Sequence, residues 1–288
     1  MATLKDIQLR MGSIKNTMQI TKAMKMVAAS KMRRAEEAIT NSRPYSEKLR
    51  SIISNLSTGI DQSAHPLLEK REGGKAVVLL ISTDRGLCGG LNVNLCKQLS
   101  SFIPDQSNNF DVVELITFGK KGTEYFSNRG GNIVESFKDL KDQQRADSLE
   151  KTVRDLIKNY TEGEFNHLYI AYNRFNNVVS QTPVIKQVLP IEPPTGESSN
   201  PEENTEFVFE PSGMAILNAI LPQYVENQAF TGLLDNNASE HAARMTAMDA
   251  ATNNASDMLA KLQIQFNRAR QAAITSELIE IISGAEAV

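Results

Sequence analysis

The hydrophobic positions at the start of the chain follow a helical heptad pattern. From about Thr3 to Thr58 apolar residues recur at alternating spacings of three and four, and the first proline is Pro44. The stripe runs through Leu4, Ile7, Met11, Ile14, Met18, Thr21, Lys25, Ala28, Met32, Ala35 and Ile39. This spacing predicts one long helix with a seam for a coiled-coil partner.

A second apolar row opens around Lys25, where a charged residue interrupts the stripe. Ile20, Met24 and Val27 fall on another face of the same helix. A helix that is apolar on more than one side has more than one surface to cover. We therefore expect this part of the helix to contact something besides its coiled-coil mate.

The end of the chain repeats the pattern. No proline follows Pro222, and after Gly232 the only glycine is Gly284. The stripe passes through Met245, Met248, Thr252, Ala255, Leu259, Leu262, Phe266, Ala269 and Ala273. About 50 residues of helix at 1.5 Å per residue make a rod on the order of 70 Å long. The chain leaves the first rod at the middle segment and enters the second rod from that same segment. The two rods are therefore expected to pair antiparallel.

The middle of the chain alternates between apolar strands and helices. Strands are expected at residues 75–82, 111–118, 132–135, 167–173 and 182–190. Helices are expected at residues 92–103, from about 120, and at 146–160. Strands separated by helices predict a mostly parallel, Rossmann-like sheet with helical cover. The expected fold class is α/β, with this domain inserted into a long antiparallel two-helix coiled coil.

These patterns divide the chain into three segments. We expect a coiled-coil helix at residues 1–58, the α/β domain at 59–210, and a second coiled-coil helix at 211–288. Within the domain, residues 192–206 read EPPTGESSNPEENTE. This proline-rich, polar and acidic stretch predicts a flexible surface loop.

Composition narrows the class of protein. The chain has 288 residues, 41% of them hydrophobic, which can supply a core. The longest apolar run, Ala76–Ile81, is far short of the roughly 20 residues that a membrane-spanning helix needs. The first residues show no apolar signal core. A bacterial cytoplasm fits best, with any membrane association made through a partner.

Candidate chemistry is sparse. Cys88 and Cys96 lack the paired spacing of a zinc site or a redox dithiol, and the three histidines are scattered. The motif STDRGLCGGLN follows the first strand, where doubly wound folds often bind phosphates. It lacks both the dinucleotide spacing and the lysine of a phosphate loop, so a tight structural turn is the preferred interpretation over a nucleotide site. We assign no catalytic residue, cofactor or metal.

The charge is uneven along the chain. The formal net charge is −3, yet every charged residue between Ile7 and Ala35 is basic. Clustered lysine and arginine can neutralise nucleic-acid phosphates. No aromatic residue lies between Ala2 and Pro44 to stack on bases, so an acidic protein surface is the preferred target over nucleic acid.

Four segments carry a resemblance to the gamma subunits of F-type ATP synthases. They are ITKAMKMVAASKMRRA (Ile20–Ala35), DRGLCGGLN (Asp84–Asn92), SEHAARMTAMDAATNNA (Ser239–Ala255) and ITSELIEIISGAEA (Ile274–Ala287). The resemblance covers essentially the whole chain. It implies a non-catalytic rotor shaft that couples proton flow to ATP synthesis at the cytoplasmic face of the bacterial plasma membrane.

The resemblance also implies partners and contact residues. The coiled coil would enter a hexamer of alternating alpha and beta subunits, and the α/β domain would meet the epsilon subunit and the membrane ring. Contacts with a beta subunit and along the shaft would come from Lys22, Met24, Lys25, Arg270, Gln271, Thr275 and Glu277. The foot toward epsilon and the ring would comprise Phe207, Phe209 and Glu210 in FVFEPS. Family members often carry tyrosine at these aromatic positions.

Two other classes stay open on the sequence. An α/β enzyme with helical dimerisation arms would bind a nucleotide or small substrate as an isolated chain. A static coiled-coil adaptor would hold its partners at one fixed angle.

Overall fold

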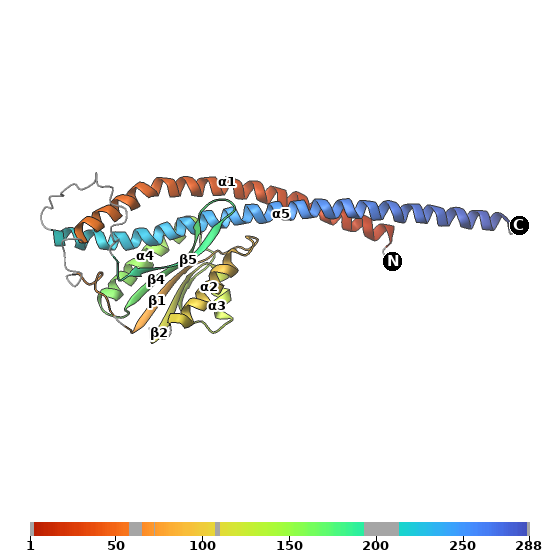
Figure 1. Cartoon of the computed structure of the whole chain (residues 1–288). Coiled ribbons are helices and arrows are strands. Elements are labelled where there is room, and N and C mark those ends of the chain that lie inside the picture. The colour runs from red at the N-terminus through yellow and green to blue at the C-terminus, as the bar shows by residue number, and fades with distance from the viewer. Residues whose placement is uncertain (1–2, 58–64, 72, 107–109, 193–212, 287–288) are drawn as a thin grey trace. The chain divides into compact units, whose positions relative to one another are not determined.

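A computed structural model describes residues 3–57, 65–71, 73–106, 110–192 and 213–286 (Figure 1). The chain forms two compact units, a first unit of Met1–Ser30 with Arg244–Val288 and a second unit of Lys31–Ala243. Two long helices, α1 (Leu4–Ser57) and α5 (Gly213–Glu286), each contribute to both. The division by chain order into residues 1–58, 59–210 and 211–288 stays a prediction.

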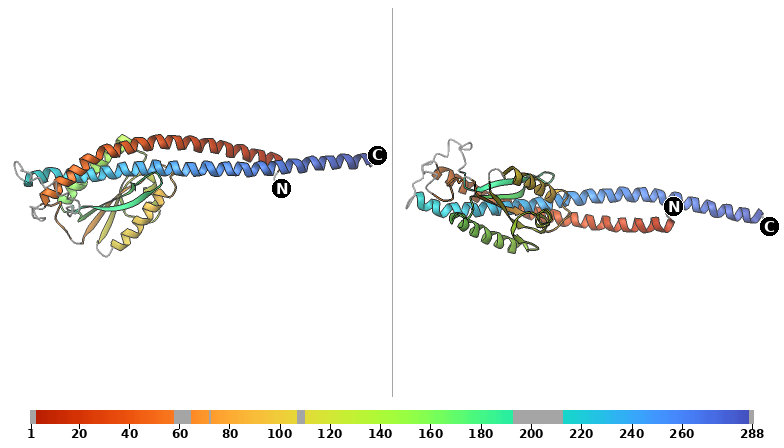
Figure 2. Two further views of the ribbon diagram at one scale, coloured as in Figure 1. Left: turned by 45° about the horizontal axis from the view of Figure 1, so that its top comes forward. Right: turned by 90° about the horizontal axis from the view of Figure 1, so that it is seen from below.

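The first unit is an antiparallel pair of helices made by the start of α1 and the end of α5 (Figure 2). The Thr21 and Thr252 hydroxyls lie 2.7 Å apart, and the Lys25 ammonium lies 2.6 Å from the Asp249 carboxylate. A later residue on α1 thus meets an earlier residue on α5. Every member of the two predicted stripes within this unit is buried or half-buried. The coiled coil expected from the heptad pattern is confirmed.

The second unit contains a five-stranded sheet with the order β3-β2-β1-β4-β5. Its strands are β1 (Lys75–Ile81), β2 (Val112–Phe118), β3 (Ile133–Phe137), β4 (His167–Phe175) and β5 (Gln181–Leu189). β1 pairs in parallel with β2 and β4, β2 pairs in parallel with β3, and β5 runs antiparallel to β4. The strands agree with the predicted ranges to within a few residues, and the Rossmann-like α/β class is confirmed.

Helices cover both faces of the sheet (Figure 1). The crossover helices are α2 (Leu91–Gln106), α3 (Lys120–Ser127) and α4 (Asp142–Thr161). Successive strand residues point to opposite faces. Val78 therefore packs with α2 and α3, whereas Leu79 packs with α4 and α5. Burial on both faces explains why β1 reads as one continuous apolar run.

No helix in the described part of the chain offers a stretch that is both long and apolar enough to cross a lipid bilayer.

Candidate functional site

The described residues predicted to contact partners lie in the first unit, on both of its helices. On α1, Lys22 is exposed, whereas Met24 and Lys25 are half-buried. On α5 the four predicted residues are all exposed: Arg270, Gln271, Thr275 and Glu277. The predicted foot residues Phe207, Phe209 and Glu210 lie outside the described residues.

Lys25 occupies the seam rather than an outer face. Its ammonium pairs with Asp249 across the two helices, and the two side chains are 42% and 47% exposed. An ion pair this exposed contributes only about 0.2–1 kcal/mol. Asp249 was not among the residues predicted from the sequence, although a lysine within an apolar seam indicates an acidic residue on the facing helix.

Of the second apolar row predicted on α1, Ile20 and Val27 are exposed, whereas Met24 is half-buried. Ile20 is 60% exposed and Val27 is 58% exposed, and Met26 beside them is 62% exposed. Exposed Lys22 lies in the same stretch. An apolar surface interrupted by cations suits a partner that is partly apolar and partly acidic.

The stripe on α5 ends at Ala273, and α5 extends beyond the start of α1 (Figure 2). Past that point five large apolar side chains are between 48% and 68% exposed: Ile274, Leu278, Ile279, Ile281 and Ile282. A group of large exposed apolar side chains such as this is typical of an interaction surface.

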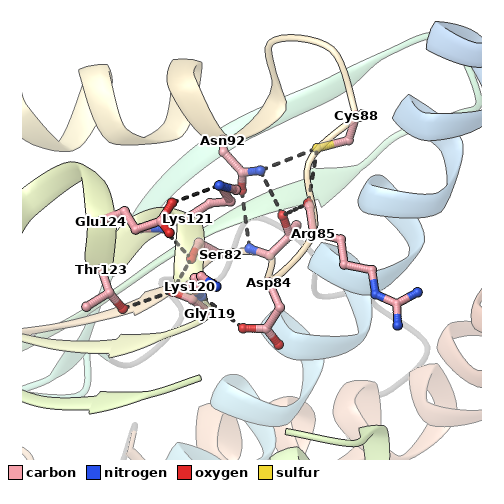
Figure 3. Close-up of polar contacts among 12 residues, drawn as sticks. Ser82, Asp84, Arg85, Cys88, Asn92, Gly119, Lys120, Lys121, Thr123 and Glu124 are labelled. Atoms are coloured by element: carbon pink, nitrogen blue, oxygen red, sulfur yellow. Dashed lines mark hydrogen bonds and ion pairs between the residues drawn. The ribbon is translucent and has the colours of Figure 1, made fainter. Parts of the chain in front are cut away.

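The loop that follows β1 is held by its own side chains (Figure 3). The Asp84 carboxylate accepts hydrogen bonds from the backbone N–H groups of Lys120, at 2.9 Å, and Asp139, at 3.1 Å. Asn92 accepts from the Thr83 N–H and donates to the Thr83 hydroxyl, which itself donates to the carbonyl of the Arg85 residue.

The position of Asp84 disfavours an anion site at the N-terminus of α3. Lys120 is the first residue of α3, so Asp84 occupies the place where a helix N-terminus would bind an anion. A phosphate there would meet a carboxylate. The motif STDRGLCGGLN itself leads into α2, and there the Asn92 and Thr83 side chains hydrogen-bond to each other and to the loop backbone, which is typical of a structural turn.

The thiols and the described acids offer no metal site. Cys88 and Cys96 are buried, and burial raises the pKa of the Cys96 thiol to about 12. Among the residues that the structure describes, no group of three or more His, Cys, Asp or Glu side chains could hold a metal ion.

On α5, Asp235 is half-buried beside β4. Burial raises the pKa of this carboxyl to about 6, against the opposing influence of Arg174, Arg43 and the Phe175 N–H. The folded chain therefore binds the proton more tightly than the unfolded chain, whose carboxyl has a pKa near 3.8. The group makes the free energy of unfolding fall as pH rises from about 4 to about 6, and the loss persists above that window.

Asp235→Asn is expected to raise the thermal midpoint at about pH 7.5 and to change it little at about pH 4. The amide cannot ionise, yet it can still accept from the Phe175 N–H. Melting curves of both proteins across this range check the prediction. A difference between them that does not depend on pH would contradict it.

Comparisons with known proteins match this chain over essentially its whole length. A family model described as ATP synthase matches residues 3–288. The chain is 44% identical to the ATP synthase gamma chain of Geotalea uraniireducens over 288 residues, which cover 100% of this chain and 99% of that protein. It is 43% identical to the ATP synthase gamma chain of Pelotomaculum thermopropionicum, with 100% of both chains covered.

Solved structures share the fold. A chain in the OSCP/F1/c-ring structure of the Euglena gracilis mitochondrial ATP synthase is similar, with a TM-score of 0.67 at 20% identity, covering 99% of this chain and 94% of that one. A chain in the rotor structure of the same complex has a TM-score of 0.64 at 18% identity, covering 94% of this chain and 98% of that one.

Proposed function

Because the chain belongs to the ATP synthase gamma chain family, we propose that it is the central shaft of a bacterial F-type ATP synthase. It would carry torque between a membrane rotor ring and a hexamer of alpha and beta subunits, and so couple proton flow to ATP synthesis. The observation that carries the proposal is the two-helix rod of the first unit, whose α1 helix exposes apolar side chains and lysines. The chain itself would hold no catalytic site.

The mechanism follows from the asymmetry of the rod. Two helices of different sequence present a different face to each of three beta subunits, so the angle of the rod biases each catalytic site toward one conformation. Individual contacts must stay weak, because a deep pocket worth several kcal/mol would hold the rod at one angle. Adaptable methionines and dispersed lysines meet that requirement.

The contact residues are assigned by position in the shaft. We assign Met24 and Lys25, with Lys22 beside them, to the acidic loop of a beta subunit. The Lys25–Asp249 pair is weak and exposed, so the lysine can exchange partners at little cost. The other shaft contacts are assigned to Arg270, Gln271, Thr275 and Glu277.

The α/β domain would meet the epsilon subunit and the membrane ring at the cytoplasmic face of the plasma membrane. Membrane association would then run through the complex alone. The foot assigned to this contact comprises Phe207, Phe209 and Glu210, and that assignment rests on the FVFEPS motif.

Co-expression with alpha and beta subunits tests the proposal. We expect all three to purify together and the complex to turn a marker fixed to the α/β domain when ATP is supplied. A complex that assembles but holds the marker still would indicate a static adaptor. An isolated chain that binds nucleotide saturably and fails to join the hexamer would indicate an enzyme.

We call the five exposed apolar side chains beyond Ala273 the apolar tip. Ending the chain at Ala273 should separate the role of this tip from the stability of the fold. All stripe residues remain, so the free energy of unfolding is expected to change by no more than about 0.5 kcal/mol. The five exposed apolar side chains beyond Ala273 are lost, so the torque of the assembled complex is expected to fall. Stall torque in single complexes and melting of the free chain measure the two effects.

A chain ending at Ile282 is the matched control, because it shortens the helix but keeps those five side chains. It should retain more torque than the chain that ends at Ala273. Equal torque from the two truncated chains would show that the apolar tip contributes nothing.

A further inference from the structure

A group of buried polar side chains lies between α5 and the ends of two strands. Asn236 and Ser239 on α5 are completely buried, as is Ser82 after β1, and Asn173 on β4 is 1% exposed. All four belong to the second unit. Polar side chains are uncommon at such depth unless their hydrogen bonds are satisfied there.

Asn236 joins the two strands with its side-chain amide. Its oxygen accepts from the backbone N–H of Asn173 at 3.4 Å and from the Asn173 side-chain amide at 3.0 Å. Its nitrogen donates to the carbonyl of Ser82 at 3.4 Å. The ladder between β1 and β4 extends as far as Leu80 and Ala171. The amide therefore bridges the strands two residues beyond their last pair, with the same donor and acceptor as a peptide group.

Two further bonds close the group. The Ser239 hydroxyl donates to the carbonyl of Asn173 at 3.0 Å. The guanidinium of Arg145, on α4 and 6% exposed, donates to the carbonyl of Ser82 at 2.6 Å. We call Ser82, Arg145, Asn173, Asn236 and Ser239 the polar clamp.

The polar clamp differs in kind from the remaining contacts of α5 with the sheet. Leu221, Val225 and Leu233 are buried in the core on the same helix, and apolar contact is not directional. Hydrogen bonds weaken steeply when their angle or length changes, and a buried polar group without a partner is costly. Turning or sliding α5 on the sheet would break the clamp before it exposed much apolar area.

We propose that the polar clamp fixes the rotational setting of α5 on the α/β domain and transmits torque between them, with Asn236 as the positioning residue. This inference rests on the proposed function as a rotor shaft. Because α5 is one continuous helix from Gly213 to Glu286, a torque delivered to it at Asn236 reaches the part of the helix in the first unit.

The test uses the assembled complex with the hexamer fixed and a marker attached to the α/β domain. Asn236→Ala is expected to widen the angular spread of the marker during pauses. It should also reduce the number of protons pumped per ATP in vesicles while ATP hydrolysis continues. Asn237→Ala, in the same helical turn and outside the clamp, should match the unmodified protein in both measurements.

Val225→Ala separates a mechanical role from a stabilising one. It deletes apolar contact on the same helix and should lower the thermal midpoint without widening the angular spread. If Asn236→Ala does not assemble, Ser239→Ala removes one bond of the clamp and is measured in the same way.

An angular spread equal to that of the unmodified protein, in Asn236→Ala or in its milder substitute, overturns the inference. So does equal widening in Val225→Ala. Failure of the unmodified chain to rotate would instead refute the proposed function, so the two failures are distinguishable.

Discussion

Replacing Ala255 with aspartate is expected to separate the two helices of the first unit. Ala255 is 8% exposed and lies on the α5 stripe. A carboxylate at this position would be buried against an apolar seam. A buried charge without a partner lowers the free energy of unfolding by roughly 3–5 kcal/mol. The pairing of the two helices is what makes the rod, so its stiffness would be lost with the seam.

Limited proteolysis of the free chain and proton pumping by the assembled complex measure this effect. We expect faster cleavage within residues 4–30 and hydrolysis with little pumping. Asn254→Asp is the control, because it adds the same charge one position away on the exposed side of the helix. Equal behaviour of the two variants would mean that the seam does not hold the rod together.

Replacing Gly119 with alanine is expected to destabilise the α/β domain by more than about 4 kcal/mol. Gly119 has a φ of 109°, a conformation that residues with a side chain rarely adopt. An added Cβ would also lie 2.5 Å from the carbonyl oxygen of Ser82, which is backbone and cannot move aside cheaply. The two costs act at the same position, where β2 passes into α3.

Thermal melting tests this prediction, with an expected drop on the order of 10 °C. Gly86→Ala is a matched control in the neighbouring loop, since a Cβ there would meet nothing within 4 Å. A Gly119→Ala midpoint as high as that of Gly86→Ala would show that the turn tolerates a side chain.

The periodicity of the sequence was enough to predict the two coiled-coil stripes and strand β1, because their burial follows from the spacing of neighbouring residues. Each stripe residue within the first unit is buried or half-buried because a heptad seam follows directly from the helical repeat. The range of β1 could also be predicted, because a strand buried on both faces leaves an unbroken apolar run in the sequence.

Contacts between residues far apart in the sequence could not be predicted from periodicity. The partner of Lys25 is 224 positions away, and a single stripe does not give its register against another helix. Asn236 resembles an exposed polar residue in the sequence, since only the tertiary structure brings it to the ends of β1 and β4. The helix also continues through Pro222, where Leu217 and Leu221 anchor its early turns in the core.

The assigned contact residues have a different status. Their roles depend on the surfaces of other chains, and those surfaces are not encoded in the spacing of this one. Met24 and Arg270 therefore remain proposals, whereas the seam that positions them follows from this chain's own structure.

The small number of buried residues in the first unit has a consequence for a free subunit that is not yet assembled. Within its described residues only five are less than a tenth exposed: Ile7, Thr21, Ala28, Met248 and Ala255. Helices held by so few side chains open readily, and opened segments are where proteases cut. In the free subunit, proteolysis is therefore expected to begin in this unit and not in the α/β domain.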